Sequence, residues 1–339
     1  MNLLTVGIIS YNRPFELERT IKSLLPLPDN VEVVICDDNS PKIDEILIHV
    51  KDHIKDSNIN FVSNSVNLGY DRNLYKVIQL ANSEFVLLLG DDDYLETGAL
   101  QNIINFLKNH KDLKCGFIKY TDEFATSRSF NSNVYFDKTT LMKNGDFVYN
   151  SILFSGLIFS KQHVVLYENI FEKFFHSIYI QVAIFCFLNA KYGSYFIHGP
   201  GIIIGGDGEN GFGFNEASSK ADIDLMDRTK SISNLSYHKR LFNVLLNIEY
   251  EINSKFFDKF IFEYKIRAIK ALFNARKISR DYLRLYWVGL KKLGIKKIWL
   301  IEPIYLFFYI IPYNILAIFI LFFESLFLKY RNYKNNKTI

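Results

Sequence analysis

The first hundred residues alternate between two hydrophobic patterns, and this alternation is the feature that most constrains the fold. Short apolar runs rich in β-branched residues are typical of buried strands, whereas apolar residues that recur every three or four positions are typical of helices. Strands are expected at 3–10, 31–36, 59–62 and 85–89, with helices between them at 14–25, 43–54 and 74–81. This order predicts an α/β fold with a mostly parallel sheet and flanking helices.

The rest of the chain contains fewer strands and ends in helices. Further elements are expected as helices at 97–110 and 171–190 and as strands at 115–120, 151–159, 195–198 and 200–204. A glycine-rich loop follows, and the residues after about 220 show helical patterns rich in Lys and Arg. We predict three parts: an α/β domain at 1–215, a helical C-terminal region at 216–297, and an apolar segment with a basic tail at 298–339.

Net charge and cysteine content indicate the kind of partner and the compartment to expect. The formal net charge of the 339-residue chain is only +4, which does not favour a nucleic-acid partner. Cys36, Cys115 and Cys186 lie far apart in apolar runs, so we expect buried free thiols, as in a reducing cytoplasm. The N-terminus begins directly with a strand pattern, and no signal peptide is expected.

An uncharged stretch at 304–323 is long enough to cross a bilayer as a helix. Pro303 and Pro312 interrupt it, and a single crossing would leave one basic flank on the non-cytoplasmic side. We therefore expect a peripheral or re-entrant segment, bent at Pro312, on the cytoplasmic face of the inner membrane. The alternative is a helical hairpin buried in a soluble core. The basic flanks are Lys291, Lys292, Lys296 and Lys297 before the stretch and Lys329, Arg331, Lys334 and Lys337 after it.

Polar residues follow each of the first four expected strands. Ligands of such sheets bind beyond the carboxyl ends of the strands, so these clusters should converge on one rim. The clusters are Tyr11-Asn12-Arg13, Asp37 to Ser40, Asn64 to Asn73, and Gly90 to Tyr94.

Asp91-Asp92-Asp93 carries the strongest chemical signal. Like-charge repulsion makes three adjacent carboxylates costly unless a cation neutralises them, and their hard oxygens suit Mg²⁺ or Mn²⁺. The alternative is an acidic loop that caps the following helix. Asp37 and Asp38, at the end of another strand, favour a site for a metal ion and a nucleotide.

Four motifs together resemble the family 2 glycosyltransferases, which have the Rossmann-like GT-A fold. They are IISYNRP at 8–14, VICDDNS at 34–40, NLGYDRN at 67–73 and LLGDDDY at 88–94. The sequence is most similar to bacterial members that build surface polysaccharides, in particular the abequosyltransferase-like branch, and the resemblance covers roughly residues 1 to 215.

The resemblance implies a role for each motif. Asp91 and Asp93 match the outer carboxylates of the family's Asp-x-Asp motif and would bind the metal, with Asp93 making the direct contact and Asp92 turned toward the ribose. Arg72 would lie near phosphate, although an ion pair with one of these carboxylates is the alternative. The residues implied to bind the nucleotide-sugar are Tyr11, Asn12, Arg13, Asp37, Asp38, Asn67, Gly69, Arg72, Asn73 and Asp92. Apart from the resemblance, the glycine-rich loop at 205–213 would close over the donor, with Asn210 or backbone N–H groups meeting phosphate, and a bare surface loop is the alternative.

The general base is where the sequence departs from the family pattern. Many relatives carry Glu-Asp at the start of the acceptor-side helix, but the stretch 174–181 contains no acid. His176 is the nearest titratable group, and its ordinary pKa suits proton abstraction near neutral pH. A capping or core histidine is the alternative, and Glu168 and Glu172 are further candidates.

The resemblance implies a metal-dependent, inverting transfer of a sugar from a nucleotide-sugar donor to a lipid-linked or growing glycan acceptor at the membrane surface. One alternative enzyme is a nucleotidyltransferase, although residues 10–13 lack the glycine-rich signature that it favours. The other alternative is a catalytically inactive scaffold that binds nucleotide or glycan.

Overall fold

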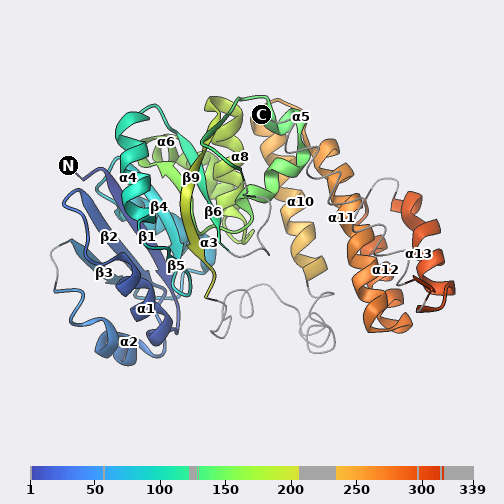
Figure 1. Ribbon diagram of the computed structural model, residues 1–339, viewed down its shortest axis with the longest axis horizontal. Helices are drawn as coiled ribbons and strands as arrows, with labels where there is room; N and C mark the ends of the chain where they lie inside the picture. The colour runs from blue at the N-terminus through green and yellow to red at the C-terminus, as the bar shows by residue number, and fades with distance from the viewer. Residues whose placement is uncertain are drawn as a thin grey trace. The chain divides into compact units, whose positions relative to one another are not determined.

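The computed structural model divides the chain into two compact units, which are described separately. One unit comprises Met1–Ala217 and Asn243–Phe256, and the other comprises Ser218–Phe242 and Phe257–Ile339 (Figure 1). The structure describes residues 2–55, 58–121, 128, 130–205, 234–295, 298–313 and 315–316.

The first unit is built on a nine-stranded sheet. The order of strands is β3-β2-β1-β4-β8-β6-β9-β5, and β7 also pairs with β9. Their bounds are β1 Leu4–Ser10, β2 Val31–Asp37, β3 Ile59–Ser63, β4 Phe85–Gly90, β5 Tyr94–Leu95, β6 Cys115–Tyr120, β7 Val134–Phe136, β8 Leu157–Ser160 and β9 Ser194–Ile203.

The sheet is mixed, so the expectation of a mostly parallel sheet is wrong for its second half. Strands β1, β2, β3 and β4 pair in parallel, and so do β6 and β9. Strand β8 runs antiparallel to both β4 and β6. The strand pattern alone does not encode the direction in which a strand runs, so this difference could not be predicted.

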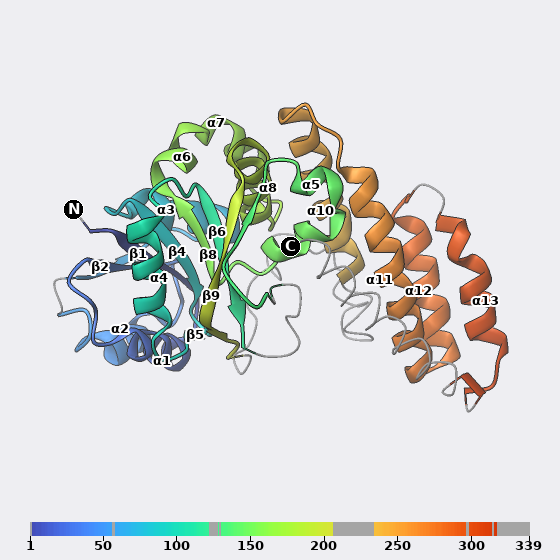
Figure 2. The ribbon, with the colours of Figure 1, turned by 45° about the horizontal axis from the view of Figure 1, so that its top comes forward.

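Helices cover both faces of the sheet (Figure 2). On one face, α1 (Pro14–Leu24), α2 (Ile43–Val50) and α4 (Ala99–Asn109) bury Leu17, Ile46 and Ile103 against strand residues such as Val6. The other face is packed by α3 (Tyr70–Leu80), α6 (Lys161–Leu166) and α8 (Ile180–Tyr192). Shorter helices are α5 Thr140–Lys143, η2 Gly145–Ser151, α7 Glu168–Phe171 and η3 Glu172–Phe174.

Most of the expected elements are present, but α3 begins at Tyr70 rather than at 74, β5 and β7 were not expected, and three further segments differ. The strand expected at 151–159 is only β8, because η2 extends to Ser151. The helix expected at 171–190 is interrupted, because His176 and Ile178 have left-handed backbone conformations and α8 begins after them. The two short strands expected at 195–204 form one strand, β9. All three cysteines are buried free thiols, as predicted.

The second unit is helical, as expected. It contains α11 (Phe257–Ile278), α12 (Arg280–Lys292), η4 (Ile298–Ile301) and α13 (Glu302–Ile310), while α10 (Asn234–Glu251) has residues in both units. Helix α13 ends two residues before Pro312. Within the described residues, no helix combines the length and apolar character that a membrane crossing requires. Most of the apolar stretch beyond Pro312 lies outside those residues.

Gly7 permits the contact between α3 and the sheet. A Cβ at this position would lie 2.3 Å from Cγ1 of Val77 in α3 and 3.3 Å from Cγ1 of Val86. Gly7→Ala should therefore lower the free energy of unfolding by about 2 kcal/mol, as overpacking does in other cores. Urea denaturation measures the change. In a Val77→Ala background the same substitution should cost less, and an equal cost would contradict the steric explanation.

Candidate functional site

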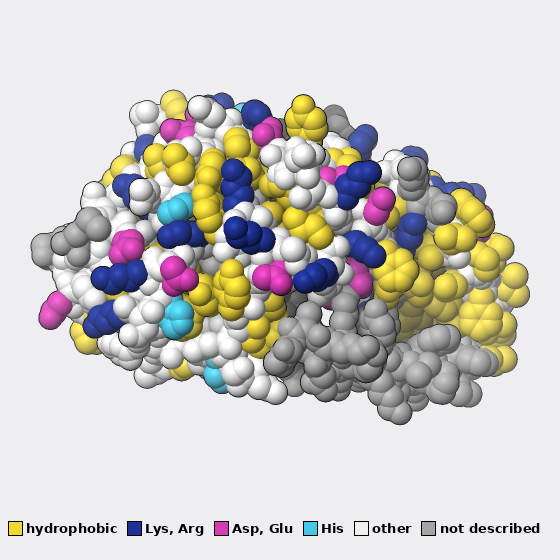
Figure 3. All heavy atoms as spheres, turned by 90° about the horizontal axis from the view of Figure 1, so that it is seen from above, with side chains coloured by type: hydrophobic (Ala, Val, Ile, Leu, Met, Phe, Trp, Pro, Cys, Tyr) yellow, Lys and Arg dark blue, Asp and Glu magenta, His cyan; other side chains and the backbone are white. Residues whose placement is uncertain are grey.

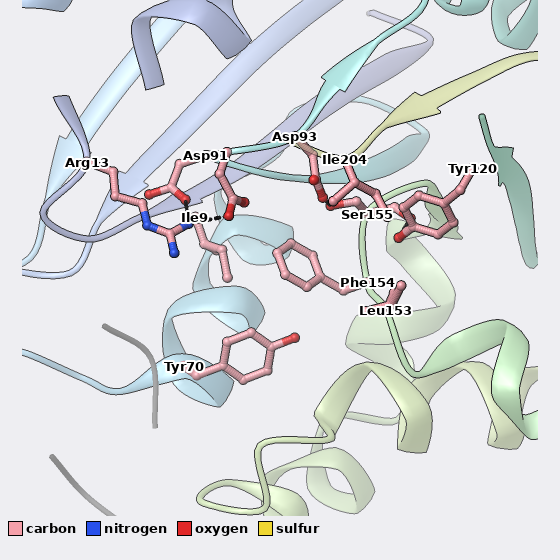
Figure 4. Close-up of a pocket in the computed structure, with 11 residues that line it drawn as sticks. Ile9, Arg13, Tyr70, Asp91, Asp93, Tyr120, Leu153, Phe154, Ser155 and Ile204 are labelled. Carbon is pink, nitrogen blue, oxygen red and sulfur yellow. Dashed lines mark hydrogen bonds and ion pairs between the residues drawn. The ribbon is translucent and has the colours of Figure 1, made fainter. Parts of the chain in front are cut away.

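A pocket of about 340 Å³ lies at the carboxyl edge of the sheet (Figure 4). It is bordered by the ends of β1, β4 and β6, by the residue after β9, and by the residues before β8. Because β8 is antiparallel to β4, it starts where β4 ends, and this direction brings Ser155 to the same rim. The lining residues are Ile9, Arg13, Tyr70, Asp91, Asp92, Asp93, Tyr120, Leu153, Phe154, Ser155 and Ile204.

Arg13 neutralises two of the three carboxylates. Its Nη1 atom lies 3.0 Å from Oδ1 of Asp91 and 2.6 Å from Oδ2 of Asp92, and the guanidinium is almost fully buried. The other oxygen of Asp91 accepts a hydrogen bond of 3.1 Å from the backbone N–H of Tyr11. Burial raises the pKa of Asp91 to about 7, although the charge of Arg13 opposes the increase. Both oxygens of Asp91 therefore have partners within the chain.

Helix α1 fixes the backbone that carries the three aspartates. The hydroxyl of Thr20 lies 2.9 Å from the carbonyl oxygen of Asp91 and 2.7 Å from that of Asp93. Arg19 donates from Nη2 to the carbonyl of Asp92 at 3.0 Å. The Pro at the first position of α1 starts this helix directly after the β1 loop, so α1 begins beside the acidic residues.

Asp93 faces the pocket. Its Oδ2 accepts a hydrogen bond of 2.5 Å from the Ser155 hydroxyl, and that hydroxyl accepts one of 2.9 Å from the N–H of Gly90. The N–H of Gly205 lies 3.4 Å from the other oxygen. A Cβ on Gly90 would approach Asp92 and Asp93 within 3.0 and 3.3 Å, so glycine leaves room for the carboxylates. Burial raises the pKa of Asp93 to about 6, despite the hydrogen bond from Ser155.

A divalent cation at this pocket would need oxygen ligands from the described residues or from its substrate. Among them, no group of three or more His, Cys, Asp and Glu side chains is arranged to hold a metal ion. Mg²⁺ is commonly bound by one or two carboxylates together with substrate phosphates, however, so a cage of protein ligands is not required. Asp93 fits this kind of site. Asp91 does not, because the Arg13 cation lies against its buried carboxylate. The partners of Asp93, the Ser155 hydroxyl and the Gly205 N–H, are by contrast neutral.

Asp37 and Asp38 hold the loops of the rim together. Asp38 is 1% exposed and accepts hydrogen bonds from the side-chain amide of Asn64 and from the N–H groups of Leu68 and Gly69. Asp37 accepts from the hydroxyls of Ser40 and Ser63 and from the N–H of Ser40. Neither carboxylate lines the pocket.

The other predicted rim residues have structural contacts. Asn12, left-handed at φ 63°, donates its N–H to the hydroxyl of Ser40 and accepts from the N–H of Lys42. Asn73 is buried and donates to the carbonyl of Cys36. Asn67 is exposed and accepts from the N–H of Gly69, whose φ of 78° suits glycine.

Three predicted residues lie away from the carboxylates or beyond the described structure. The guanidinium of Arg72 lies 5.3 Å from the ring centroid of Phe175 and does not line the pocket. His176 is exposed, just before α8. Asn210 lies outside the described residues.

Sequence reasoning missed the aromatic half of the pocket. Tyr70 and Phe154 form an edge-to-face pair with ring centroids 5.7 Å apart, and Tyr120 donates its hydroxyl to the carbonyl of Ser155 at 2.7 Å. Tyr70 lies inside the motif at 67–73, so its position was available from the sequence. Phe154 and Ser155 carry no motif and depend on the direction of β8.

Arg128 supports this half of the pocket from behind. It is fully buried and donates hydrogen bonds to the carbonyls of Asn150, Leu153 and Ser155. Its guanidinium lies 4.7 Å from the centroid of the Tyr120 ring. Arg128 thus holds the segment before β8, including Ser155, in place.

Comparison with a protein-family model gives the family. Residues 5–171 match the model described as Glycosyl transferase family 2. This part of the chain is a family 2 glycosyltransferase domain. The four motifs and the pocket at the end of β4 all lie in or beside it.

Three curated relatives match the family 2 domain in part. UDP-Glc:alpha-D-GlcNAc-diphosphoundecaprenol beta-1,3-glucosyltransferase WfaP of Escherichia coli is 30% identical over 33% of this chain and 43% of its own length. Abequosyltransferase RfbV of Salmonella typhimurium is 31% identical over 33% of this chain and 34% of its own length. GalNAc(5)-diNAcBac-PP-undecaprenol beta-1,3-glucosyltransferase of Campylobacter jejuni is 27% identical over 58% and 63%. The chain therefore spans less than two thirds of each relative.

A solved structure supports the fold. The crystal structure of S. aureus TarS 1-349 in complex with UDP-GlcNAc has a TM-score of 0.51 and 15% identity, over 87% of this chain and 89% of that one. At this identity the likeness shows the GT-A-like fold alone.

Arg13→Met should destabilise the family 2 domain by about 3 kcal/mol, because it leaves the buried Asp91 carboxylate without its cation. The pKa of Asp91 is raised in the folded protein from its ordinary value of 3.8 to about 7, so the folded state binds this proton more tightly than the unfolded state. The stability that the bound proton contributes is therefore lost as the pH rises through about 7. The cost of the substitution should therefore be larger near about pH 8 than near about pH 6, as measured by urea denaturation at both values.

Lys22→Met provides the control. Lys22 pairs with Glu18 on the surface, and its side chain is 58% exposed. Its loss should change stability by less than about 0.5 kcal/mol at either pH. Equal costs for the two substitutions would contradict the importance of the buried pair.

Proposed function

We propose that the protein is a glycosyltransferase that moves a sugar from a nucleotide-diphosphate sugar to a lipid-linked or growing glycan acceptor in bacterial surface polysaccharide synthesis. The family 2 domain and the names of the partial relatives support this proposal. The observation that carries it is the division of one pocket into a charged end, with Arg13 and three aspartates, and an aromatic end, with Tyr70, Phe154 and Tyr120.

The two ends suit the two parts of such a donor. Asp93 would hold Mg²⁺ or Mn²⁺, and a bound divalent ion supplies Lewis-acid stabilisation of the charge that grows on a leaving diphosphate. Arg13 contributes fixed positive charge beside it. Tyr70 and Phe154 offer rings against which the apolar face of a sugar can pack.

The roles of the remaining predicted residues are revised by their contacts. Asp92 is more exposed than Asp91, with 27% of its side chain accessible, which suits a contact with the ribose. Asp37, Asp38 and Asn73 would act through the loops that they hold. In place of two carboxylate ligands, we propose that Asp93 alone binds the metal.

An inverting transfer needs a group that accepts the proton of the acceptor hydroxyl. His176 is the proposed base, because it is exposed immediately before α8 and a neutral imidazole can accept a proton. The surrounding rim is formed by Tyr11, Asn12, Asn67, Gly69 and Arg72. Asn210 follows the pocket residue Ile204 in the sequence.

A hydrophobic surface of the second unit supports contact with a membrane. Exposed fractions reach 61% at Trp299, 51% at Leu300 and 67% at Ile310. Figure 3 shows hydrophobic side chains gathered over the end of this unit. Arg276 and Arg280 donate to the carbonyls of Phe308 and Ile310, two of those that the end of α13 leaves without an intrahelical partner. We propose that α13 and η4 lie in the headgroup region of an anionic membrane.

The activity is tested by incubating the protein with UDP-, GDP-, CDP- and TDP-sugars, with and without Mn²⁺, and measuring release of nucleoside diphosphate. Release should depend on the metal, and Asp93→Ala should reduce it by at least about a hundredfold. Asp52→Ala removes an exposed aspartate paired with Lys55 and should have no effect. Release of pyrophosphate would instead indicate nucleotidyl transfer, and binding without turnover would indicate a scaffold.

The membrane contact is tested by co-sedimentation with vesicles of phosphatidylglycerol and phosphatidylcholine. Ile310→Glu should reduce the bound fraction by about tenfold, since burial of this side chain is lost and a negative charge is added. Leu246→Glu, on a residue of α10 that is 45% exposed, should leave binding unchanged. Equal loss with both variants, or no binding by the unaltered protein, would contradict the proposal.

A further inference from the structure

The buried carboxylate of Asp71 caps the first turn of α8 from a different helix. Its Oδ2 accepts a hydrogen bond of 2.7 Å from the N–H of Ile178, and its Oδ1 accepts one of 3.1 Å from the N–H of Ile180. Asp71 belongs to α3, more than a hundred residues earlier in the chain, and is 3% exposed. The first turn of a helix leaves N–H groups without intrahelical partners, and a negative charge there is favourable.

The backbone that Asp71 holds is strained. His176 has a φ of 72° and Ile178 a φ of 64°, and a β-branched residue in this left-handed region is a clear outlier. Such conformations persist only where surrounding contacts impose them, and they cluster at functional sites. The two hydrogen bonds to Asp71 are contacts of this kind, because they join the strained residue and the start of α8 to one carboxylate.

The strained turn is connected to the pocket on two sides. Tyr70, the neighbour of Asp71, lines the pocket and packs edge-to-face on Phe154. Gln181, in the first turn of α8, donates from Nε2 to the carbonyl of Ile152 at 2.8 Å, immediately before the lining segment 153–155. The turn is therefore connected to the residues that form the aromatic end of the pocket, where we place the sugar.

Asp71 itself is unsuited to reacting with an acceptor. Both of its oxygens are bonded to N–H groups, and the side chain is buried. Burial raises the pKa of Asp71 to about 6, the two backbone N–H groups oppose the increase, and the nearby His176 also lowers the value. His176 is exposed on the same turn, two residues before Ile178.

We propose that Asp71 is a positioning residue that fixes the left-handed turn 176–178 and so sets the place of His176 beside the acceptor. This inference rests on the proposed function, because it assigns the acceptor side of the same pocket. The carboxylate that shapes this side then comes from α3, and the start of α8 needs no acid of its own.

The test separates sugar transfer from donor binding. Asp71→Asn keeps the size of the side chain but presents at most one oxygen to the two N–H groups. Transfer to a glycan acceptor should fall by at least about tenfold, while the affinity for the nucleotide-sugar and the slow metal-dependent hydrolysis of the donor stay unchanged. Hydrogen exchange at residues 178 and 180 should accelerate in the same variant.

Two further variants keep the test decisive. In the Asp71→Asn background, Ile178→Gly should restore part of the transfer, because glycine adopts the left-handed conformation without strain. Glu32→Gln is the matched control: Glu32 also holds a loop, through Asn82 and Ser83, but at the opposite end of the sheet. It should leave the ratio of transfer to hydrolysis unchanged.

The results distinguish this inference from the proposed function. Equal losses of transfer and donor binding in Asp71→Asn, or unchanged transfer with accelerated exchange, would overturn the positioning role. If the unaltered protein transfers no sugar from any donor, the proposed function itself is contradicted, independently of the role of Asp71. Unchanged exchange at residues 178 and 180 in Asp71→Asn would overturn the inference independently of activity.

Discussion

The ion pairs between Arg13 and the carboxylates of Asp91 and Asp92 are the constraint on which the rest of the site depends. Parallel pairing of β1 and β4 brings the residues after both strands to one edge, and this arrangement would place uncompensated charges in a buried position. Arg13 resolves the conflict by neutralising the inner carboxylate. With Asp91 satisfied, Asp93 is left to face the pocket, and Thr20 and Ser155 fix its backbone and side chain.

The sequence was sufficient to predict the first half of the sheet and the charged half of the pocket. Hydrophobic periodicity located β1 to β4, because β1, β2 and β4 are almost wholly buried and all four strands are bounded by polar residues. Arg13 and the three aspartates follow the ends of parallel strands, and the carboxyl ends of parallel strands lie at the same edge of a sheet. The sequence therefore predicts that these side chains lie close together. The same argument also grouped Asp37 and Asp38 with the pocket, although their carboxylates serve the neighbouring loops.

The aromatic half could not be predicted for a physical reason. A strand pattern has a period of two in either direction, so nothing in residues 151–160 shows that β8 runs antiparallel to β4. That direction alone decides whether Phe154 and Ser155 lie at the pocket or at the far edge of the sheet. The break before α8 could not be predicted either. The apolar character of residues 171–190 is continuous, and the left-handed turn is held by a carboxylate that is distant in the sequence, Asp71.

The balance of charge in the pocket has a consequence for the order of binding. Its lining residues include three aspartates and one arginine, a formal sum of −2 when all are ionised. A diphosphate entering alone would meet net repulsion, whereas a bound divalent cation would bring this formal sum to zero and place a positive charge beside the phosphates. For a donor of the proposed kind, cation and donor would therefore each raise the other's affinity by the same factor. The acidic pocket would thus bind its donor tightly only after the cation has bound, so the concentration of the cation would control the occupancy of the donor site.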